Sequence, residues 1–367
     1  LEGGGSTVNL PAGRITIEGL AGGWRLAGGA TVLGEGILRG TPGRPIFALD
    51  AIPVFGKTVA VKLAGDLLIH PHQGQIEIIE RVGMEEYIAS VVAAEMNPKW
   101  PERALAAQAI VARSYAASRW MERNDQAWQL HWHFGVDMAY HGWRSDHDAV
   151  IRAIAPTRGE VLMFRGFPVL ALFHASSGGR TEAFSRIKPG VFAADGRTSM
   201  ADAMPIVEDP AALPGAAGLN LSASHGEWKA DIPLPEVTKA LQDWSAKARG
   251  RPTFGVVEGI SIGERYADSG RVGTVSIRHR LDGQARFLTM AATDFRMAVS
   301  PVRIRSTWWD RCVIAAKAPG YLVLQGRGFG HGCGLSQVSA WHLARQGVSP
   351  EDIVARFYAG ARIERKY

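Results

Sequence analysis

The sequence of 367 residues contains only two cysteines, no dense run of lysine and arginine, no internal repeat and no apolar run long enough to span a bilayer. The two cysteines, Cys312 and Cys333, exclude a disulfide framework, and they leave the redox compartment and a single bridge between them open. The 41 basic residues exceed the 35 acidic ones by a net charge of +6 that is evenly spread, which argues against nucleic acid as the main partner. The chain starts at Leu1 without a methionine and shows no signal peptide, so we expect a leader or anchor to have been removed.

The most informative segment lies near the C-terminus, where five glycines alternate with other residues. It reads Gly326-Arg327-Gly328-Phe329-Gly330-His331-Gly332-Cys333-Gly334-Leu335-Ser336-Gln337. Each glycine costs about 0.5–1 kcal/mol in a regular element, so this run predicts positive φ angles or a close approach to the backbone. It follows the apolar residues 321–324 and precedes a predicted helix over 336–345, which would bring free N–H groups and a histidine to one spot.

Two other interpretations of the glycine run have to be weighed. A phosphate-binding loop does not fit, because glycine recurs at every second residue and no Gly-Lys-Ser/Thr follows. A purely structural loop is the second alternative, in which His331 bonds a backbone carbonyl. We favour a loop that contributes to a functional site.

A second segment predicts a helix from Met84 that ends near Met96, because Asn97-Pro98 disfavours its continuation and Pro101 suits the start of a new helix. Glu95 then lies at the negative end of the helix dipole, which disfavours its charged form and raises its pKa. A raised carboxyl pKa is what a general acid needs near neutral pH. The alternative is an ordinary surface glutamate.

The next predicted helix spans about 102–123. Leu105, Ala109, Ala112 and Ala116 recur at helical spacing and predict one apolar, mostly small face. Gln108 and Arg113 flank this face. An arginine beside alanines usually pairs with a carboxylate or an anionic ligand, and the alternative is a solvated side chain.

Three blocks of this sequence carry a resemblance to a known family. The first block is Glu95-Met96 with Ala104-Leu105-Ala106-Ala107-Gln108-Ala109-Ile110-Val111-Ala112-Arg113-Ser114-Tyr115. The second is His174-Ala175-Ser176-Ser177-Gly178-Gly179-Arg180-Thr181, and the third is the glycine run with Ser336-Gln337-Val338-Ser339-Ala340. These blocks resemble, in the same order, those of the stage II sporulation protein D family, also called the amidase-enhancer family. The resemblance covers roughly residues 75–367.

The resemblance implies a lytic transglycosylase of bacterial peptidoglycan, acting outside the inner membrane, in which Glu95 is the catalytic glutamate. Such an enzyme needs one carboxyl group, whereas ordinary glycoside hydrolases use two. Glu102 and Asp137 stay open as a second acid. The residues expected to bind substrate are Arg113, Gln108, His174, Ser176, Ser177, Thr181, Arg327, His331, Ser336 and Gln337. The mildly basic surface would suit a polyanionic wall polymer.

Some departures from the family pattern bear on a metal site. Cys333 stands where the family usually has a small aliphatic residue, and Ser339 where it usually has glycine. Some relatives bind zinc through histidine and cysteine after the glutamate helix, but here that region offers only His131, His133 and His141. We expect no cofactor, with zinc as the alternative. A further interpretation is that these histidines and the neighbouring Trp128, Trp132 and Trp143 line a sugar groove or merely cap a surface.

We expect an α+β fold in which the glutamate-bearing helices pack on a mixed or antiparallel sheet. Residues 1–80 form a β-rich N-terminal segment, with strands at 14–18, 58–63 and 75–79. Residues 81–367 form the catalytic domain of sporulation protein D type, with a peripheral segment at about 186–245. Asp282-Gly283 between two alternating stretches predicts a hairpin with a type I′ turn, and Ser349-Pro350 predicts the start of a last helix that ends near Gly360.

Three functions compete. The first is the lytic transglycosylase, acting on glycan strands that an amidase has stripped of peptides. The second is a non-catalytic wall-binding protein that stimulates an N-acetylmuramoyl-L-alanine amidase. The third, a hydrolase using Ser336 and His331, lacks a third orienting group.

Overall fold

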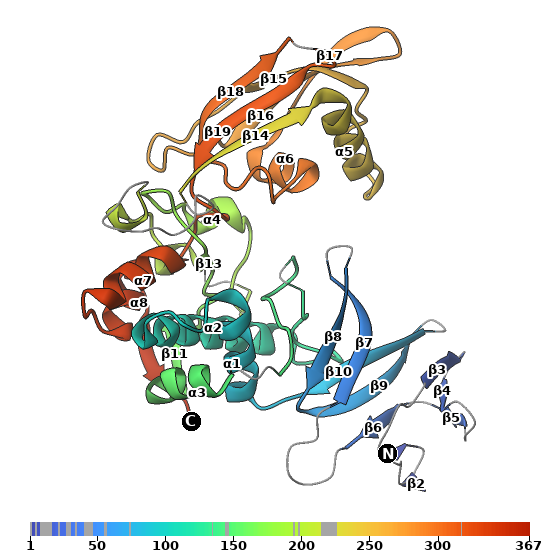
Figure 1. Cartoon of the computed structure of the whole chain (residues 1–367), viewed down its shortest axis with the longest axis vertical. Coiled ribbons are helices and arrows are strands. Elements are labelled where there is room, and N and C mark those ends of the chain that lie inside the picture. Colours follow the sequence, from blue (N-terminus) through green and yellow to red (C-terminus); the bar gives the residue numbers. More distant parts are fainter. Residues whose placement is uncertain are drawn as a thin grey trace. The chain divides into compact units, whose positions relative to one another are not determined.

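The computed structural model describes residues 2–3, 6–7, 17–20, 23–26, 31–33, 35–39, 47–54, 57–72, 75–133, 135–143, 147–193, 195–196, 199–213, 226–316 and 318–367. The chain divides into two compact units. Unit one comprises Leu1–Lys99 and Arg123–Arg158, and unit two comprises Trp100–Glu122 and Gly159–Tyr367. Figure 1 shows the chain coloured along the sequence, from blue at the N-terminus to red at the C-terminus. Over the described ranges, no helix combines the length and the apolar character that crossing a bilayer requires.

The N-terminal part of unit one is built from antiparallel strands. One sheet has the order β10-β9-β6-β1-β2, and its strands are β10 (Gln75–Arg81), β9 (Asp66–His72), β6 (Gly36–Leu38), β1 (Glu2–Gly3) and β2 (Ser6–Thr7). The remaining strands are β3 (Ile17–Leu20), β4 (Gly23–Leu26) and β5 (Thr31–Leu33) in one sheet, and β7 (Phe47–Val54) and β8 (Lys57–Leu63) in another. The predicted strands at 58–63 and 75–79 are confirmed. Of the predicted strand at 14–18, residues 14–16 lie outside the described residues.

The helices of unit one are α1 (Met84–Glu95) and α3 (His147–Ile154), followed by the short η1 (Ala155–Thr157). The two α-helices pack against each other. Ile88, Val91 and Val92 of α1 and Val150 of α3 are fully buried, so this contact forms an apolar core. The end of α1 at Glu95 is where the sequence predicted it.

Unit two is organised around α2 (Glu102–Glu122), which packs on β11 (Glu160–Phe164), β12 (Phe167–Pro168), α7 (Gln337–Arg345) and α8 (Pro350–Phe357). The sheet beneath it has the antiparallel order β12-β11-β21, with β21 at Arg362–Arg365. The prediction of a single apolar face on α2 is wrong, because every residue from Ala104 to Ala116 is buried. The many alanines let neighbours approach on all sides.

A short parallel pair, β13 (Phe173–His174) with β20 (Leu335–Ser336), brings two distant segments of unit two together. The intervening chain forms α4 (Phe184–Ile187), η2 (Ala201–Ala203) and η3 (Pro210–Ala212). The other named sheets of the described residues contain antiparallel strand pairs.

Residues 226–327 of unit two form their own core. One antiparallel sheet has the order β14-β19-β18, with β14 at Glu227–Pro233, β19 at Tyr321–Arg327 and β18 at Trp309–Ala315. The second is β15 (Val256–Ile262), β16 (Thr274–Leu281) and β17 (Gln284–Ala291). Helices α5 (Leu234–Ala246) and α6 (Ala292–Val299) lie beside these sheets (Figure 1). They contribute Leu241 and Phe295 to a core that also contains Trp309 and Leu322.

Two local sequence predictions are confirmed, the turn at Asp282-Gly283 and the start of the last helix at Ser349-Pro350. Asp282 and Gly283 both have positive φ, 51° and 78°, as a type I′ turn requires, and Leu281 pairs with Gln284 across it. The side chain of Ser349 accepts the Asp352 N–H at 3.1 Å and caps α8, which ends at Phe357. The α+β class is confirmed, and the boundary near residue 80 and the peripheral character of 186–245 stay predictions.

Candidate functional site

Glu95 is the last residue of α1, and its carboxyl is half-buried. The Met96 N–H still donates to the Val92 carbonyl at 2.9 Å, after which the chain leaves the helix at Asn97-Pro98. Oε1 of Glu95 accepts the backbone N–H of Ala139 at 2.7 Å. Burial raises the pKa of Glu95 from 4.5 to about 7, and the bond from Ala139 opposes this shift. The carboxyl therefore exists in both protonation states near neutral pH.

The loop that carries Ala139 is held by a buried ion pair. The side chain of Asp137 is 0% exposed, and its Oδ2 accepts Nη1 of Arg123 at 2.8 Å. The same oxygen accepts the His131 N–H at 2.8 Å. Asp137 was an open candidate for a second acid, but these bonds commit its carboxylate to ordering the loop.

Tyr140, next to Ala139, is fixed on two sides. Its hydroxyl donates to Oε2 of Glu80 at 2.6 Å, and its ring stacks on Tyr87 with centroids 5.2 Å apart. Burial and the Glu80 carboxylate raise the pKa of Tyr140 well above its ordinary value, so the hydroxyl stays a donor. The Tyr140 N–H donates to the Trp132 carbonyl at 3.0 Å. The backbone at 139–140 is thus anchored by contacts within the protein.

The candidate zinc ligands His131 and His133 lie on the same loop, but their Nδ1 atoms are engaged. His131 Nδ1 accepts the His133 N–H at 3.1 Å, and His133 Nδ1 accepts the Gly135 N–H at 3.0 Å. Within the described ranges, no group of three or more His, Cys, Asp or Glu side chains is arranged to hold a metal ion. The ligand set does not fit a zinc site, so no step below involves a metal, and the expectation of no cofactor stays a prediction.

In unit two, Arg113 and Gln108 are both fully buried. Nη1 of Arg113 donates to the Glu160 carbonyl at 2.9 Å, so the interpretation of Arg113 as a solvated surface arginine is wrong. Oε1 of Gln108 accepts Nε2 of Gln337 at 3.5 Å, which connects the first and third sequence blocks. The substrate-binding roles of Arg113, Gln108 and Gln337 stay predictions.

The second and third sequence blocks are side by side. His174 pairs with Ser336 in the parallel pair β13–β20, and Ser176 exchanges two backbone bonds with Phe329, at 3.0 and 2.8 Å. Gly330 has a φ of 106°, and a Cβ there would lie 2.7 Å from Cβ of His174. The predicted positive φ angles and close approaches of the glycine run are confirmed.

A buried aspartate that the sequence analysis missed connects these blocks. Asp209 is 0% exposed, and its carboxylate accepts the hydroxyls of Ser177 and Ser339, each at 2.6 Å. The Ser339 hydroxyl also lies 3.1 Å from that of Ser336. No sequence motif indicates a role for Asp209, because its hydrogen-bond partners lie far from it in the sequence.

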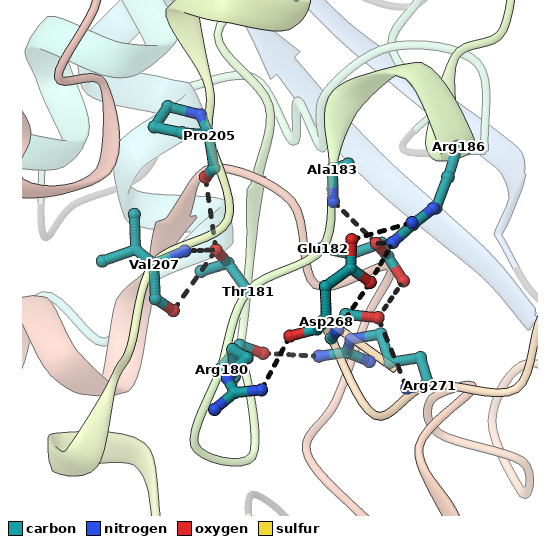
Figure 2. A network of polar contacts seen from close by, with 10 residues as sticks. Arg180, Thr181, Glu182, Ala183, Arg186, Pro205, Val207, Asp268 and Arg271 are labelled. Carbon is teal, nitrogen blue, oxygen red and sulfur yellow. Dashed lines mark hydrogen bonds and ion pairs between the residues drawn. The ribbon is translucent and has the colours of Figure 1, made fainter. Parts of the chain in front are cut away.

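The segment from Arg180 to Arg186 is held by a charged network (Figure 2). The Glu182 carboxylate, 2% exposed, pairs with Arg186 at 2.9 Å and accepts the Ser269 hydroxyl at 2.7 Å. Thr181 Oγ1 accepts the Val207 N–H at 2.7 Å. The fully buried Arg271 donates to the Ser177 carbonyl at 2.6 Å, and burial lowers its pKa to about 10. The hydroxyls of Ser177 and Thr181 therefore support the loop from inside, and their sugar contacts stay predictions.

The two histidines of these blocks are neutral near pH 7. Burial lowers the pKa of His174 well below 6.5 and that of His331 to about 3, and nearby cationic side chains act in the same direction. His331 Nδ1 accepts the Cys333 N–H at 3.0 Å, and His174 Nδ1 lies 3.1 Å from the Cys333 carbonyl. A pKa of about 3 makes His331 a weak base, which weakens the hydrolase interpretation.

Two remaining sequence predictions concern Arg327 and the cysteines. Arg327 is the last residue of β19, pairs with Asp310 at 3.0 Å and places its guanidinium 4.7 Å from the centre of a Trp308 ring. Its substrate contact stays a prediction. Cys312 and Cys333 are both free thiols, so the bridge left open by the sequence is not formed.

Comparisons with known proteins give two family models and several relatives. A model described as Stage II sporulation protein matches residues 72–164, and one described as Domain of unknown function (DUF8618) matches residues 216–334. An uncharacterized protein of Brachyspira hyodysenteriae is 23% identical over 308 residues, which cover 83% of this chain and 72% of the relative. Stage II sporulation protein D of Bacillus amyloliquefaciens is 25% identical over 305 residues, which cover 78% of this chain and 75% of the relative.

A further relative carries the second name expected from the sequence. The amidase enhancer of Bacillus subtilis is 20% identical over 296 residues, which cover 75% of this chain and 40% of the relative. The range matched by the sporulation-protein model contains Glu95, Arg113 and the loop that carries Ala139. The resemblance to the stage II sporulation protein D and amidase-enhancer family is therefore confirmed.

Proposed function

We propose that this chain is a lytic transglycosylase that cleaves peptidoglycan glycan strands, with Glu95 as its single general acid and base. The observation that carries the proposal is the Glu95 carboxyl, half-buried at a helix end, bonded to the Ala139 N–H, with a pKa raised to about 7. Similarity to this family supports a role at the cell wall. Such a role would place the protein outside the cytoplasmic membrane.

The proposed reaction needs one titratable group, because Glu95 first donates a proton and then accepts one. Protonated Glu95 donates its proton to the oxygen that links N-acetylmuramic acid to N-acetylglucosamine, and the bond from C1 to that oxygen breaks. The carboxylate then accepts the proton of the muramic acid 6-hydroxyl as its oxygen attacks C1. The product ends in a 1,6-anhydro ring, and no water is consumed.

The surroundings of Glu95 favour this cycle over two-carboxylate hydrolysis. Asp137, on the loop that contacts Glu95, is already paired with Arg123 and fully buried. A hydrolase needs a second carboxylate to activate water or to attack the sugar. The Ala139 N–H stabilises the carboxylate after proton transfer, which limits how far burial can raise its pKa.

Purified glycan strands without stem peptides provide the test. Incubation with the protein should give products with 1,6-anhydro ends, each lighter by one water than the corresponding reducing-end product, and mass spectrometry separates the two. Reducing ends would overturn the lytic mechanism. Intact strands would overturn the catalytic proposal altogether.

The match to the amidase enhancer favours a second candidate, a protein that binds the wall and stimulates an N-acetylmuramoyl-L-alanine amidase without cleaving glycan itself. The two candidates differ in their dependence on Glu95. Stimulation of an amidase that survives Glu95→Gln unchanged, together with intact glycan strands, would favour the enhancer.

A further inference from the structure

Four aromatic side chains on the loop that contacts Glu95 gather into one cluster. The ring centroids of Trp128 and His131 are 5.8 Å apart with an edge-on geometry, and those of His131 and Trp132 are 5.9 Å apart and stacked. The rings of Trp132 and His133 meet edge-on at 5.5 Å. All four residues are half-buried, so the cluster is partly open to solvent.

The cluster is ordered by the same contacts that order the loop. The Arg123 guanidinium lies 5.6 Å from the centre of a Trp128 ring, and Nη1 of Arg123 donates to the Gln129 carbonyl at 2.9 Å. The Arg123 charge is met by the buried Asp137 carboxylate, which also accepts the His131 N–H. The rings are therefore preorganised, and ligand binding does not have to order them.

Two hydrogen bonds donated by backbone N–H groups connect the cluster to the proposed catalytic carboxyl. The Trp132 carbonyl accepts the Tyr140 N–H at 3.0 Å, and the neighbouring Ala139 N–H donates to Glu95 at 2.7 Å. The position of the rings and the position of the carboxyl are thus fixed by one backbone segment.

We propose that Trp128, His131 and Trp132 form a glycan-binding platform that holds a sugar ring of the strand acted on at Glu95; this inference rests on the function proposed above. The C–H face of a pyranose packs on the negative face of an aromatic ring, while indole and imidazole N–H groups bond sugar hydroxyls at the ring edges. The Arg123 charge next to Trp128 is paired with the Asp137 carboxylate, which favours a neutral sugar over an ion. Imidazoles between the indoles give the surface polar edges that a purely apolar partner would leave unpaired.

The test measures binding without catalysis, so that it is independent of the proposed reaction. In a Glu95→Gln background, the affinity for purified peptide-free glycan strands is compared between the parent, Trp132→Ala, Trp132→Phe and Trp128→Ala. Trp120→Ala is the matched control, because Trp120 lies on α2 and is 59% exposed. We expect Trp132→Ala and Trp128→Ala each to weaken binding about tenfold, which corresponds to about 1.4 kcal/mol.

Trp132→Phe keeps an aromatic face and should bind within about threefold of the parent, which also shows that the loop tolerates substitution. Trp120→Ala should bind as the parent does. Parent-like binding by folded Trp132→Ala and Trp128→Ala overturns the platform, as does an equal loss in the Trp120 control. If Trp132→Ala fails to fold, Trp128→Ala and Trp132→Phe decide by the same criteria. Cleavage by the Glu95→Gln protein would contradict the proposed function instead, and the binding comparison would stand by itself.

Discussion

The backbone N–H of Ala139 donates a 2.7 Å hydrogen bond to the carboxyl of Glu95, although the two residues lie 44 positions apart. This bond opposes the effect of burial on the pKa of Glu95. Burial alone would favour a neutral carboxyl, while the N–H favours the carboxylate, and the resulting pKa of about 7 suits a group that must give and then accept one proton.

Replacing Glu95 by Gln keeps an oxygen for the Ala139 N–H but removes proton transfer. We expect glycan cleavage to fall by about 10² to 10⁴, with strand binding preserved. The measurement is the rate of anhydro-end formation at saturating substrate, compared with binding of the same strands. Cleavage near the parent rate would contradict the assignment of Glu95.

The pH dependence of cleavage should report the acid form of Glu95. Because the first step needs the protonated carboxyl, kcat/KM should stay level below pH about 7 and fall about tenfold per unit above it. The profile is measured on peptide-free strands. A midpoint near the ordinary value of 4.5 would show that burial does not control this group in solution.

The same shift predicts how stability changes with pH. The folded-state pKa of about 7 exceeds the ordinary 4.5, so the contribution of Glu95 is fully present below about pH 4.5 and is lost as pH rises through about 7. Glu95→Gln stays neutral at every pH. As pH rises from about 4.5 to about 7, the free energy of unfolding of the parent should therefore fall relative to that of Glu95→Gln, by on the order of 1–3 kcal/mol. Denaturant unfolding at several pH values measures the difference. A difference that is constant across the window contradicts the prediction.

Asp137 offers a test of the loop. Asp137→Ala leaves the largely buried Arg123 charge without its carboxylate, and we expect a loss of about 3 kcal/mol in unfolding free energy and lower turnover. Asp310→Ala is the matched control, because Asp310 pairs with Arg327 but is 45% exposed, and it should cost less than about 1 kcal/mol. Equal losses in the two variants would show that the buried Arg123–Asp137 pair contributes no more to the free energy of unfolding than the exposed Arg327–Asp310 pair.

Glycine positions separate backbone strain from steric conflict. Gly332 and Gly166 have nearly equal φ angles, 86° and 88°, but a Cβ on Gly332 would lie 2.4 Å from Cζ of Arg271, whereas Gly166 has nothing within 4 Å. Gly166→Ala should therefore cost only about 1 kcal/mol of backbone strain, and Gly332→Ala clearly more, because the buried guanidinium must move. Thermal or denaturant unfolding measures both. Equal costs would show that the contact with Arg271 relaxes freely.

Features that depend on neighbouring residues could be predicted from the sequence. Asn97-Pro98 fixed the end of α1 and hence the place of Glu95, Asp282-Gly283 predicted the turn between β16 and β17, and both are confirmed. The positive φ angles of the glycine run follow from the same kind of local argument. Glycine is the residue that reaches those angles without a steric cost.

Features that depend on contacts between distant residues could not be predicted from the sequence. Asp209 joins Ser177, 32 positions away, to Ser339, 130 positions away, and nothing around Asp209 in the sequence indicates either partner. The burial of α2 on all sides was missed for a related reason. An alanine-rich helix gives a weak periodic signal, so the number of elements that cover it becomes clear only from the packing.

Arg113 carries the last prediction. Its side chain is fully buried and its Nη1 bonds the Glu160 carbonyl, so a lysine at this position would bring a compact, strongly hydrated charge into a place built for a planar fork. We expect Arg113→Lys to lose about 1–3 kcal/mol of unfolding free energy and to lower turnover more than affinity, because charge attraction to substrate would survive the exchange.

Arg103→Lys is the control, since Arg103 lies on the same helix with an exposed side chain. Steady-state kinetics on glycan strands, with unfolding measured in parallel, distinguishes the roles of Arg113. A loss of affinity at unchanged turnover would favour direct binding of the muramic acid lactyl carboxylate. Unchanged stability and unchanged kinetics would contradict any role of Arg113 in folding or in the proposed activity.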